Sequence, residues 1–110
     1  MQPSFETRDS GSWRVVTVQG ELDLSTAEEL RSALGHASGA GAPRLAVDLT
    51  AVTFLDSTIL GVLVESLKQA RERGGEMRLV GVHGSPAKVI SITGLDSAFD
   101  IDATVADLPA

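Results

Sequence analysis

The stretch from Asp56 to Arg73 constrains the fold of this 110-residue chain more than any other feature of its sequence. Four apolar residues in it follow the spacing i, i+3, i+4 and i+7, which is typical of a helix that buries one face. These residues are Leu60, Leu63, Val64 and Leu67. The pair Gly74-Gly75 follows directly, and glycine is common just past a helix end. We therefore predict a long amphipathic helix that packs against a sheet.

Segments rich in β-branched and apolar residues lie on both sides of this helix. The predicted strands are Phe5–Arg8, Trp13–Gln19, Arg44–Leu49, Met77–Val82 and, as a last edge strand, Phe99–Ile101. The first two are separated by the Gly-bearing turn Asp9–Ser12, so we expect them to form a hairpin. The other strands alternate with helices, which requires parallel crossover connections.

Two shorter helices complete the predicted elements. Ser25–Glu28 has the capping-box pattern and opens a helix with Ala27, Leu30, Leu34 and Ala37 on one face. Ser85-Pro86 begins another helix, which extends to about Thr93. The fold class is therefore α/β, a mixed and mostly parallel sheet of four to five strands with helices packed on it. We expect a single domain over 1–110, with its core at about 13–101 and a short helix or tail at 103–110.

Composition excludes several classes of function. The chain has no cysteine, which rules out disulfides and thiolate metal sites, and its two histidines, His36 and His83, have no metal-ligand spacing. The net charge of −6 and the lack of a basic stripe argue against direct binding of nucleic acid. The longest apolar run, Ile59–Val64, is too short to cross a bilayer. We expect a cytoplasmic protein without a metal, a cofactor or a membrane partner.

The candidate functional site is the helix start at Asp56-Ser57-Thr58, directly after a predicted strand and a short loop. One carboxylate and two hydroxyls lie there, where free N–H groups and the helix dipole favour a negative charge such as a phosphate. The simplest role for Asp56 or Ser57 is that of an N-cap, which is the commonest task of such residues. The residues alone leave both interpretations open.

Several motifs in order along the chain resemble the STAS family, the anti-sigma factor antagonists. The similar segments are Gly20–Asp23, Asp56–Thr58 with Leu60-Gly61, Gly74–Met77 and Thr93–Leu95, within a stretch from Val15 to Ile101. Because the motifs are several and correctly spaced, the resemblance is specific. It implies a single STAS-type domain and the order of its strands.

The resemblance also implies a mechanism. The unphosphorylated protein binds an anti-sigma factor that is also a serine kinase, and this frees a sigma factor. The kinase then phosphorylates Ser57 and the complex separates, and a metal-dependent serine phosphatase restores the binding form. The expected partner-binding residues are Asp23, Asp56, Ser57, Thr58 and Ile59, with Thr58 as a second possible phosphate acceptor. The alternative role of Asp23 is turn or cap chemistry before the helix that follows.

Ile59 departs from the family pattern, which usually has a small residue at this place. It lies off the face formed by Leu60, Leu63 and Val64, so we expect it to be exposed beside Ser57, together with Val62. Two interpretations stay open: a partner-specific apolar contact, or local packing against a neighbouring loop. A bulky residue here would also hinder the access of a kinase to Ser57.

Two other classes of function compete with this hypothesis. A serine hydrolase needs a base beside its nucleophile, but neither histidine is expected near Ser57 and no Gly-x-Ser-x-Gly motif is present. We therefore do not expect an enzyme. The second alternative is a STAS accessory or scaffold subunit of a lipid-transport ATPase or of a stress-signalling complex.

Overall fold

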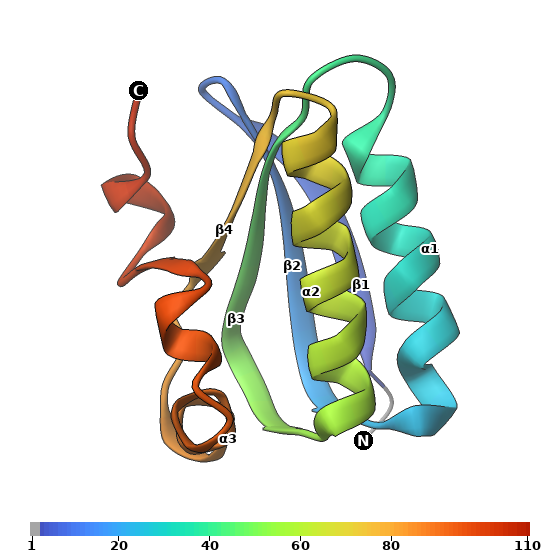
Figure 1. The fold of residues 1–110 in the computed structure, drawn as a ribbon, viewed down its shortest axis with the longest axis vertical. Coiled ribbons are helices and arrows are strands. Elements are labelled where there is room, and N and C mark those ends of the chain that lie inside the picture. The colour runs from blue at the N-terminus through green and yellow to red at the C-terminus, as the bar shows by residue number, and fades with distance from the viewer. Residues whose placement is uncertain (1–2) are drawn as a thin grey trace.

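A computed structural model describes residues 3–110. The strands are β1 (Ser4–Ser10), β2 (Trp13–Leu22), β3 (Arg44–Leu55), β4 (Glu76–Val80) and β5 (Asp100–Asp102). The helices are α1 (Ala27–Ser38), α2 (Ser57–Glu72) and α3 (Gly84–Ile92), with short 3-10 turns η1 (Leu24–Thr26), η2 (Leu95–Ser97) and η3 (Val105–Asp107). Figure 1 shows the arrangement of these elements.

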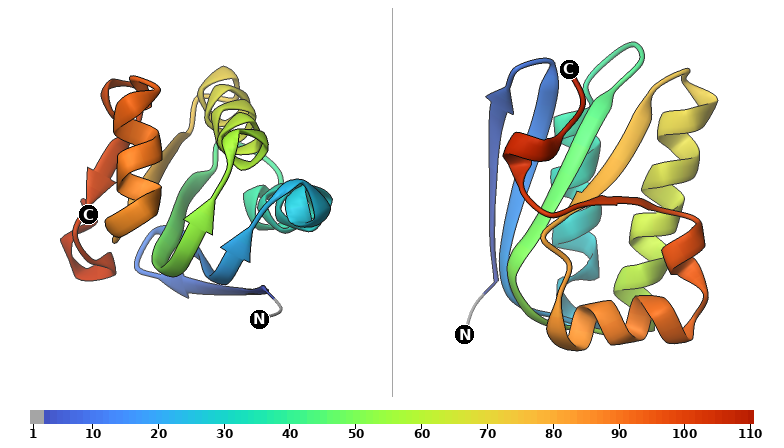
Figure 2. Two further views of the ribbon diagram at one scale, coloured as in Figure 1. Left: turned by 90° about the horizontal axis from the view of Figure 1, so that it is seen from below. Right: turned by 90° about the vertical axis from the view of Figure 1, so that its left-hand side faces the viewer.

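The five strands form one sheet in the order β1-β2-β3-β4-β5. β1 and β2 are antiparallel and form the predicted hairpin, in which Ser10 pairs with Trp13. The other neighbours are parallel, so α1, α2 and α3 are the crossover connections between them. The left view of Figure 2 shows α1 and α2 on the same side of the sheet. The predicted α/β class and the mixed, mostly parallel sheet are confirmed.

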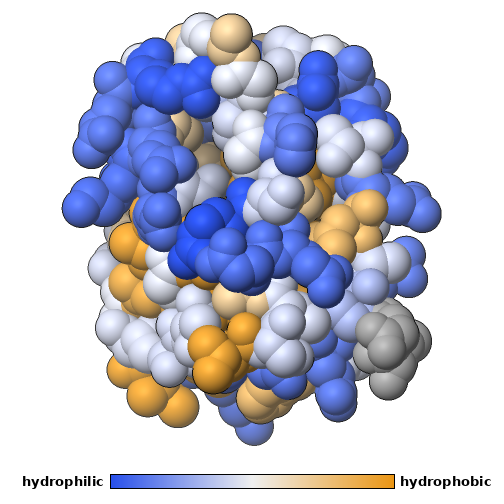
Figure 3. Space-filling view, turned by 90° about the vertical axis from the view of Figure 1, so that its right-hand side faces the viewer, coloured by the Kyte–Doolittle hydropathy of each residue, from blue (hydrophilic) through white to orange (hydrophobic). Residues whose placement is uncertain are grey.

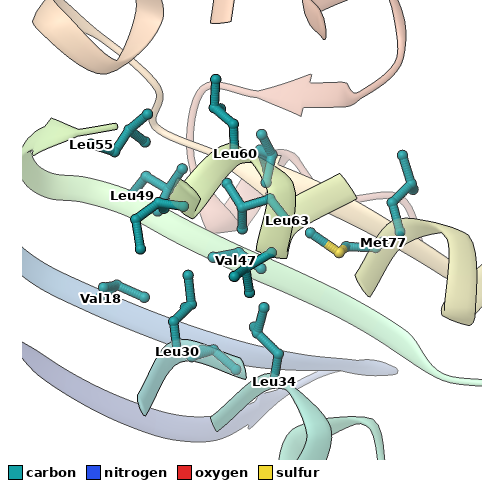
Figure 4. Close-up of a cluster of buried hydrophobic side chains, with 14 of the residues drawn as sticks. Val18, Leu30, Leu34, Val47, Leu49, Leu55, Leu60, Leu63 and Met77 are labelled. Carbon is teal, nitrogen blue, oxygen red and sulfur yellow. The ribbon is translucent and has the colours of Figure 1, made fainter. Parts of the chain in front are cut away.

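The main core lies between the sheet and the helices. Alternate residues of β2 and β3, such as Val18 and Val47, point toward Leu30 of α1 and Leu63 of α2 (Figure 4). These side chains are buried completely, and burying one side chain of this size contributes roughly 1.5–3 kcal/mol. The packing fixes α2 on β3 and thereby fixes the position of the first turn of α2.

A second, smaller cluster lies on the opposite face of the sheet. Its buried members are Trp13, Val15, Ala46 and Val80, and Val105 and Leu108 pack against them. The segment that follows β5 crosses the strands on this side (Figure 2, right). The indole Nε1–H of Trp13 donates a hydrogen bond to the carbonyl oxygen of Pro109 at 2.6 Å. The segment 103–110 is therefore docked on the domain through η3.

An ion pair holds the start of this segment. The Arg78 guanidinium donates to both carboxylate oxygens of Asp102, at 2.7 and 3.3 Å, and lies 3.6 Å from the Asp100 carboxylate. Bidentate pairs of this kind are the stronger class of charged hydrogen bond. The hydrogen bond to Asp102, with the charges of Asp102 and Asp100, raises the pKa of Arg78 above its usual range. The pair joins β4 to β5, which is only three residues long.

Trp13→Phe is expected to lower the free energy of unfolding by about 1–2 kcal/mol. The substitution keeps an aromatic ring in the second cluster but removes the shorter of two hydrogen bonds to the Pro109 carbonyl, the other coming from Arg44 Nη2 at 3.4 Å, so the end of the chain should detach more readily. Urea denaturation followed by circular dichroism measures the stability, and limited proteolysis measures access to 103–110. Unchanged stability and unchanged cleavage would show that this hydrogen bond does not hold the segment.

The strand β3 is longer than predicted. It extends to Leu55 instead of ending at Leu49, so only Asp56 separates it from α2. The added part pairs with the end of β2 through register shifts, and it buries Val52 and Leu55 in the core. Such irregularities break the strict alternation by which a strand is recognised in a sequence.

The boundaries of other elements also differ from the predictions. The 3-10 turn η1 precedes α1. Asp23 and Thr26 form the capping box of this turn, whereas the predicted pair Ser25 and Glu28 does not form one. β4 ends at Val80 instead of Val82, since Gly81 takes a φ of +70° beside Thr50. α3 begins at Gly84, with His83 as its N-cap in place of Ser85. β5 is shifted by one residue from the predicted strand.

Candidate partner-binding site

The candidate site lies where the carboxyl ends of β2 and β3 meet the amino end of α2, at the lower end of the molecule in Figure 1. Leu22 pairs with Leu55 as the last pair of these parallel strands. Asp23 directly follows β2 and Asp56 directly follows β3, so the two residues are neighbours at the same edge of the sheet. The structure thus brings together two acidic residues that are 33 positions apart in sequence.

Asp56 is the N-cap of α2. Its backbone is extended, with φ −107° and ψ −178°, and its Oδ1 accepts a hydrogen bond from the backbone N–H of Ile59 at 3.1 Å. Its carbonyl oxygen accepts the N–H of Leu60 at 3.1 Å. The capping role expected for this position is therefore present. A cap of this kind stabilises a helix by about 1 kcal/mol and sets where its first turn begins.

Ser57 is the first residue of α2 and is exposed, while Thr58 is half-buried. Within residues 3–110 no hydrogen bond engages the Ser57 hydroxyl, and Asp56 performs the capping task instead. The first turn also carries the free N–H groups and partial positive charge of a helix start. Ser57 therefore presents an accessible hydroxyl on a rigid backbone, and it is the more accessible of the two hydroxyl residues.

Ile59 does not lie on the surface, and the expectation that it is exposed beside Ser57 is wrong. Its exposed fraction is 0%, that of Val62 is 2%, and both belong to the main core. The buried face of α2 is wider than the predicted stripe because the helix contacts α1 as well as the sheet. Val64, predicted in the core, is only half-buried. The Ile59 side chain therefore packs in the core and not against a neighbouring loop.

Asp23 performs the turn chemistry that was one of its two expected roles. Its Oδ1 accepts hydrogen bonds from the backbone N–H of Ser25 at 2.9 Å and from the Ser25 hydroxyl at 2.6 Å. Its own N–H donates to the Thr26 hydroxyl at 3.1 Å. Asp23 is nevertheless exposed, so its carboxylate is both fixed in place and accessible beside Asp56.

Two exposed apolar side chains lie at the same end of the molecule as these polar residues, and neither is among the residues predicted for the site. Leu24 follows Asp23 and is 73% exposed, and Phe54 is 42% exposed two residues before Asp56. The exposure of Phe54 could be expected only if the strand were known to extend to Leu55. Neighbouring strand residues point to opposite faces, so an inward Leu55 turns Phe54 outward. Figure 3 shows apolar surface gathered mainly in the lower half of the face that it presents, toward the end that holds the site.

Both histidines have hydrogen bonds to backbone carbonyls. Nδ1 of His36 lies 2.8 Å from the carbonyl oxygen of Ser32 within α1, and Nε2 of His83 lies 2.7 Å from that of Thr50. His83 thereby ties the start of α3 to β3. Within residues 3–110 no His, Cys, Asp and Glu side chains are grouped to hold a metal ion, and no helix is long and apolar enough to cross a membrane.

The fold and the exposed serine that follows the N-cap of α2 are features that known proteins share, and comparison with them gives the family. Residues 4–108 match the family model of the STAS domain. The chain belongs to the STAS family, as its motifs indicate.

Relatives with curated names share most of their length with this chain. The anti-sigma-B factor antagonist of Listeria monocytogenes is 36% identical over 92% of this chain and 90% of its own length. The anti-sigma-B factor antagonist of Staphylococcus aureus is 31% identical over 93% of this chain and 94% of its own. Among solved structures, an anti-sigma factor antagonist from Mycobacterium paratuberculosis superposes with a TM-score of 0.86 and 31% identity. That match covers 96% of this chain and 90% of the other.

Proposed function

We propose that this protein is an anti-sigma factor antagonist, which binds an anti-sigma factor and thereby releases a sigma factor. Its similarity to the anti-sigma-B factor antagonists of Listeria monocytogenes and Staphylococcus aureus supports this role, since each match extends over nine-tenths or more of both chains. We further propose that the anti-sigma factor is a serine kinase that phosphorylates Ser57, and that a serine phosphatase reverses the modification. The protein itself acts by binding and not as an enzyme.

The observation that carries the proposal is the exposed hydroxyl of Ser57 beside the capping carboxylate of Asp56. A kinase needs its acceptor hydroxyl within reach, and no residue of α2 has to unwind to present this one. The exposed carboxylate of Asp23 and the exposed side chains of Leu24 and Phe54 lie at the same end of the sheet as Ser57. A central hydroxyl with apolar and acidic neighbours is suited to a protein interface, in which apolar contacts supply most of the affinity.

A phosphate on Ser57 would act on this interface without unfolding the domain. It adds about −1.5 to −2 charges at pH 7, which the amino end of α2 tolerates. In a packed interface, however, that charge must lose its water, and it lies beside the carboxylates of Asp56 and Asp23. Phosphorylation would therefore abolish binding through desolvation and repulsion while the fold persists.

Phosphorylation is tested by mass spectrometry. The protein is incubated with ATP and each anti-sigma kinase of its own organism, and intact mass and phosphosite are measured. We expect one added phosphate on Ser57, absent from Ser57→Ala but present in Thr58→Ala, and removed by a metal-dependent serine phosphatase. Stable binding without phosphate would leave an antagonist that has no switch. Absence of both would contradict the proposal and favour the accessory or scaffold role.

A further inference from the structure

The edge of the sheet at β1 is much longer than the edge at β5. β1 has seven residues and, within residues 3–110, pairs with β2 alone, whereas β5 has three residues. The outer side of an edge strand presents N–H and C=O groups that can pair with a further strand. The β1 edge is therefore the larger unfilled pairing surface of the described domain.

Two opposite charges on β1 have no ion-pair partner within the described part of the chain. Glu6 and Arg8 are both exposed, and as residues i and i+2 of a strand they point to the same face. The next charged residue, Asp9, is different, because it pairs with Arg14 of β2 at 2.5 Å. β1 thus carries one free negative and one free positive side chain on either side of Thr7.

We propose that β1 pairs with β1 of a second copy of this protein, antiparallel and centred on Thr7. In this register Glu6 of each copy faces Arg8 of the other, and the two-fold axis makes the contact twice. Opposite charges placed directly across two strands attract, and like charges in the same place repel. A two-fold interface of this kind is closed, so the product is a dimer whose two sheets join into one.

The hydrogen-bonding pattern of the hairpin is compatible with this register. Ser10 and Trp13 close a two-residue turn, and the closing pair of such a turn is hydrogen-bonded. Because the direction of the backbone groups alternates along a strand, those of Phe5, Thr7 and Asp9 point away from β2. Pairing centred on Thr7 brings these outward groups together.

The nearest alternative registers that also match the outward groups are centred on Glu6 or on Arg8. The first places the two Glu6 carboxylates directly opposite each other, and the second does the same with the two Arg8 guanidinium groups. Both are disfavoured by repulsion. Charged residues on an edge strand commonly prevent pairing with unrelated strands. Here the same two residues exclude other strands but complement a second copy.

The proposed dimer leaves Ser57 outside its interface. β1 and β3 are separated by β2 in the sheet, and Ser57 follows β3 at the end of that strand. The inference therefore does not depend on the proposed function. An interface built on one seven-residue edge is small, so we expect a weak dimer that forms at high protein concentration and dissociates as salt screens the charges.

Charge exchange tests the proposal by sedimentation equilibrium. We expect Glu6→Arg and Arg8→Glu each to weaken self-association by about tenfold or more, because both contacts become repulsive. The double variant, which exchanges the two charges, should dimerise like the unaltered protein. An equimolar mixture of the two single variants should form a mixed dimer, since Arg at position 6 then faces Glu at position 8. Both positions are exposed, so circular dichroism should show the same fold throughout.

Three results would overturn the proposal. One is a protein that stays monomeric at every concentration up to the millimolar range. Another is self-association that neither single exchange weakens. The third is failure of the mixture and of the double variant to restore a dimer that the single variants lose. Glu6→Gln provides a matched control, because it removes one charge without creating repulsion and should weaken the dimer less than Glu6→Arg.

Discussion

Ser57→Asp is expected to weaken binding to the anti-sigma partner by at least about a hundredfold. A charge buried in an interface without a partner costs about 2–5 kcal/mol, and each 1.4 kcal/mol corresponds to a factor of ten in affinity. The stability of the domain should change by less than about 0.5 kcal/mol, because Ser57 is exposed and a carboxylate suits the first turn of α2. Calorimetric titration with the partner measures the affinity, and urea denaturation measures the stability.

Two controls show whether the loss of affinity depends on where the charge is placed and on the loss of the Ser57 hydroxyl. Ser32→Asp adds the same charge at an exposed place on α1 and should leave the affinity within about twofold. Ser57→Ala removes the hydroxyl without adding charge, so it should retain binding and lose only the phosphorylation. Full affinity in Ser57→Asp would contradict the proposed switch, and loss of binding in Ser57→Ala would assign the hydroxyl itself to the contact.

The elements that the sequence predicts well are those whose signals are local. The hairpin was predicted from a Gly-bearing turn between two β-like runs, and α2 from its apolar spacing and from the glycines after it. The cap at Asp56 was also expected, because a short acidic side chain at a helix start accepts the N–H groups of the first turn. Each of these features depends on residues fewer than twenty positions apart.

The features that the sequence did not predict depend on contacts between distant segments. β3 extends to Leu55 because its end pairs with β2 through register shifts, which no local pattern reveals. Ile59 and Val62 are buried because α1 covers one flank of α2. The site shows the same division: Asp56 was expected as a cap, but the closeness of Asp23 follows from the pairing of Leu22 with Leu55.

Ile59→Ala is expected to lower the free energy of unfolding by about 2–5 kcal/mol, the largest effect on stability that we predict at the site. The side chain is fully buried in the main core, so its removal loses burial and leaves a cavity beneath the first turn of α2. Ile59→Val removes a single methylene and should cost only about 0.5–1.5 kcal/mol. Urea denaturation measures both, and the fluorescence of Trp13, the one tryptophan of the chain, reports unfolding.

Leu24→Ala is the matched control, because Leu24 lies at the same end of the molecule but is 73% exposed, and its stability should change by less than about 0.5 kcal/mol. Binding should show the reverse order. Leu24→Ala should weaken binding to the anti-sigma partner, whereas Ile59→Val, which stays folded, should bind the partner normally. A small stability loss in Ile59→Ala would place that side chain at the surface. Because the N–H of Ile59 is also the donor that Asp56 caps, its burial helps to hold the turn that presents Ser57.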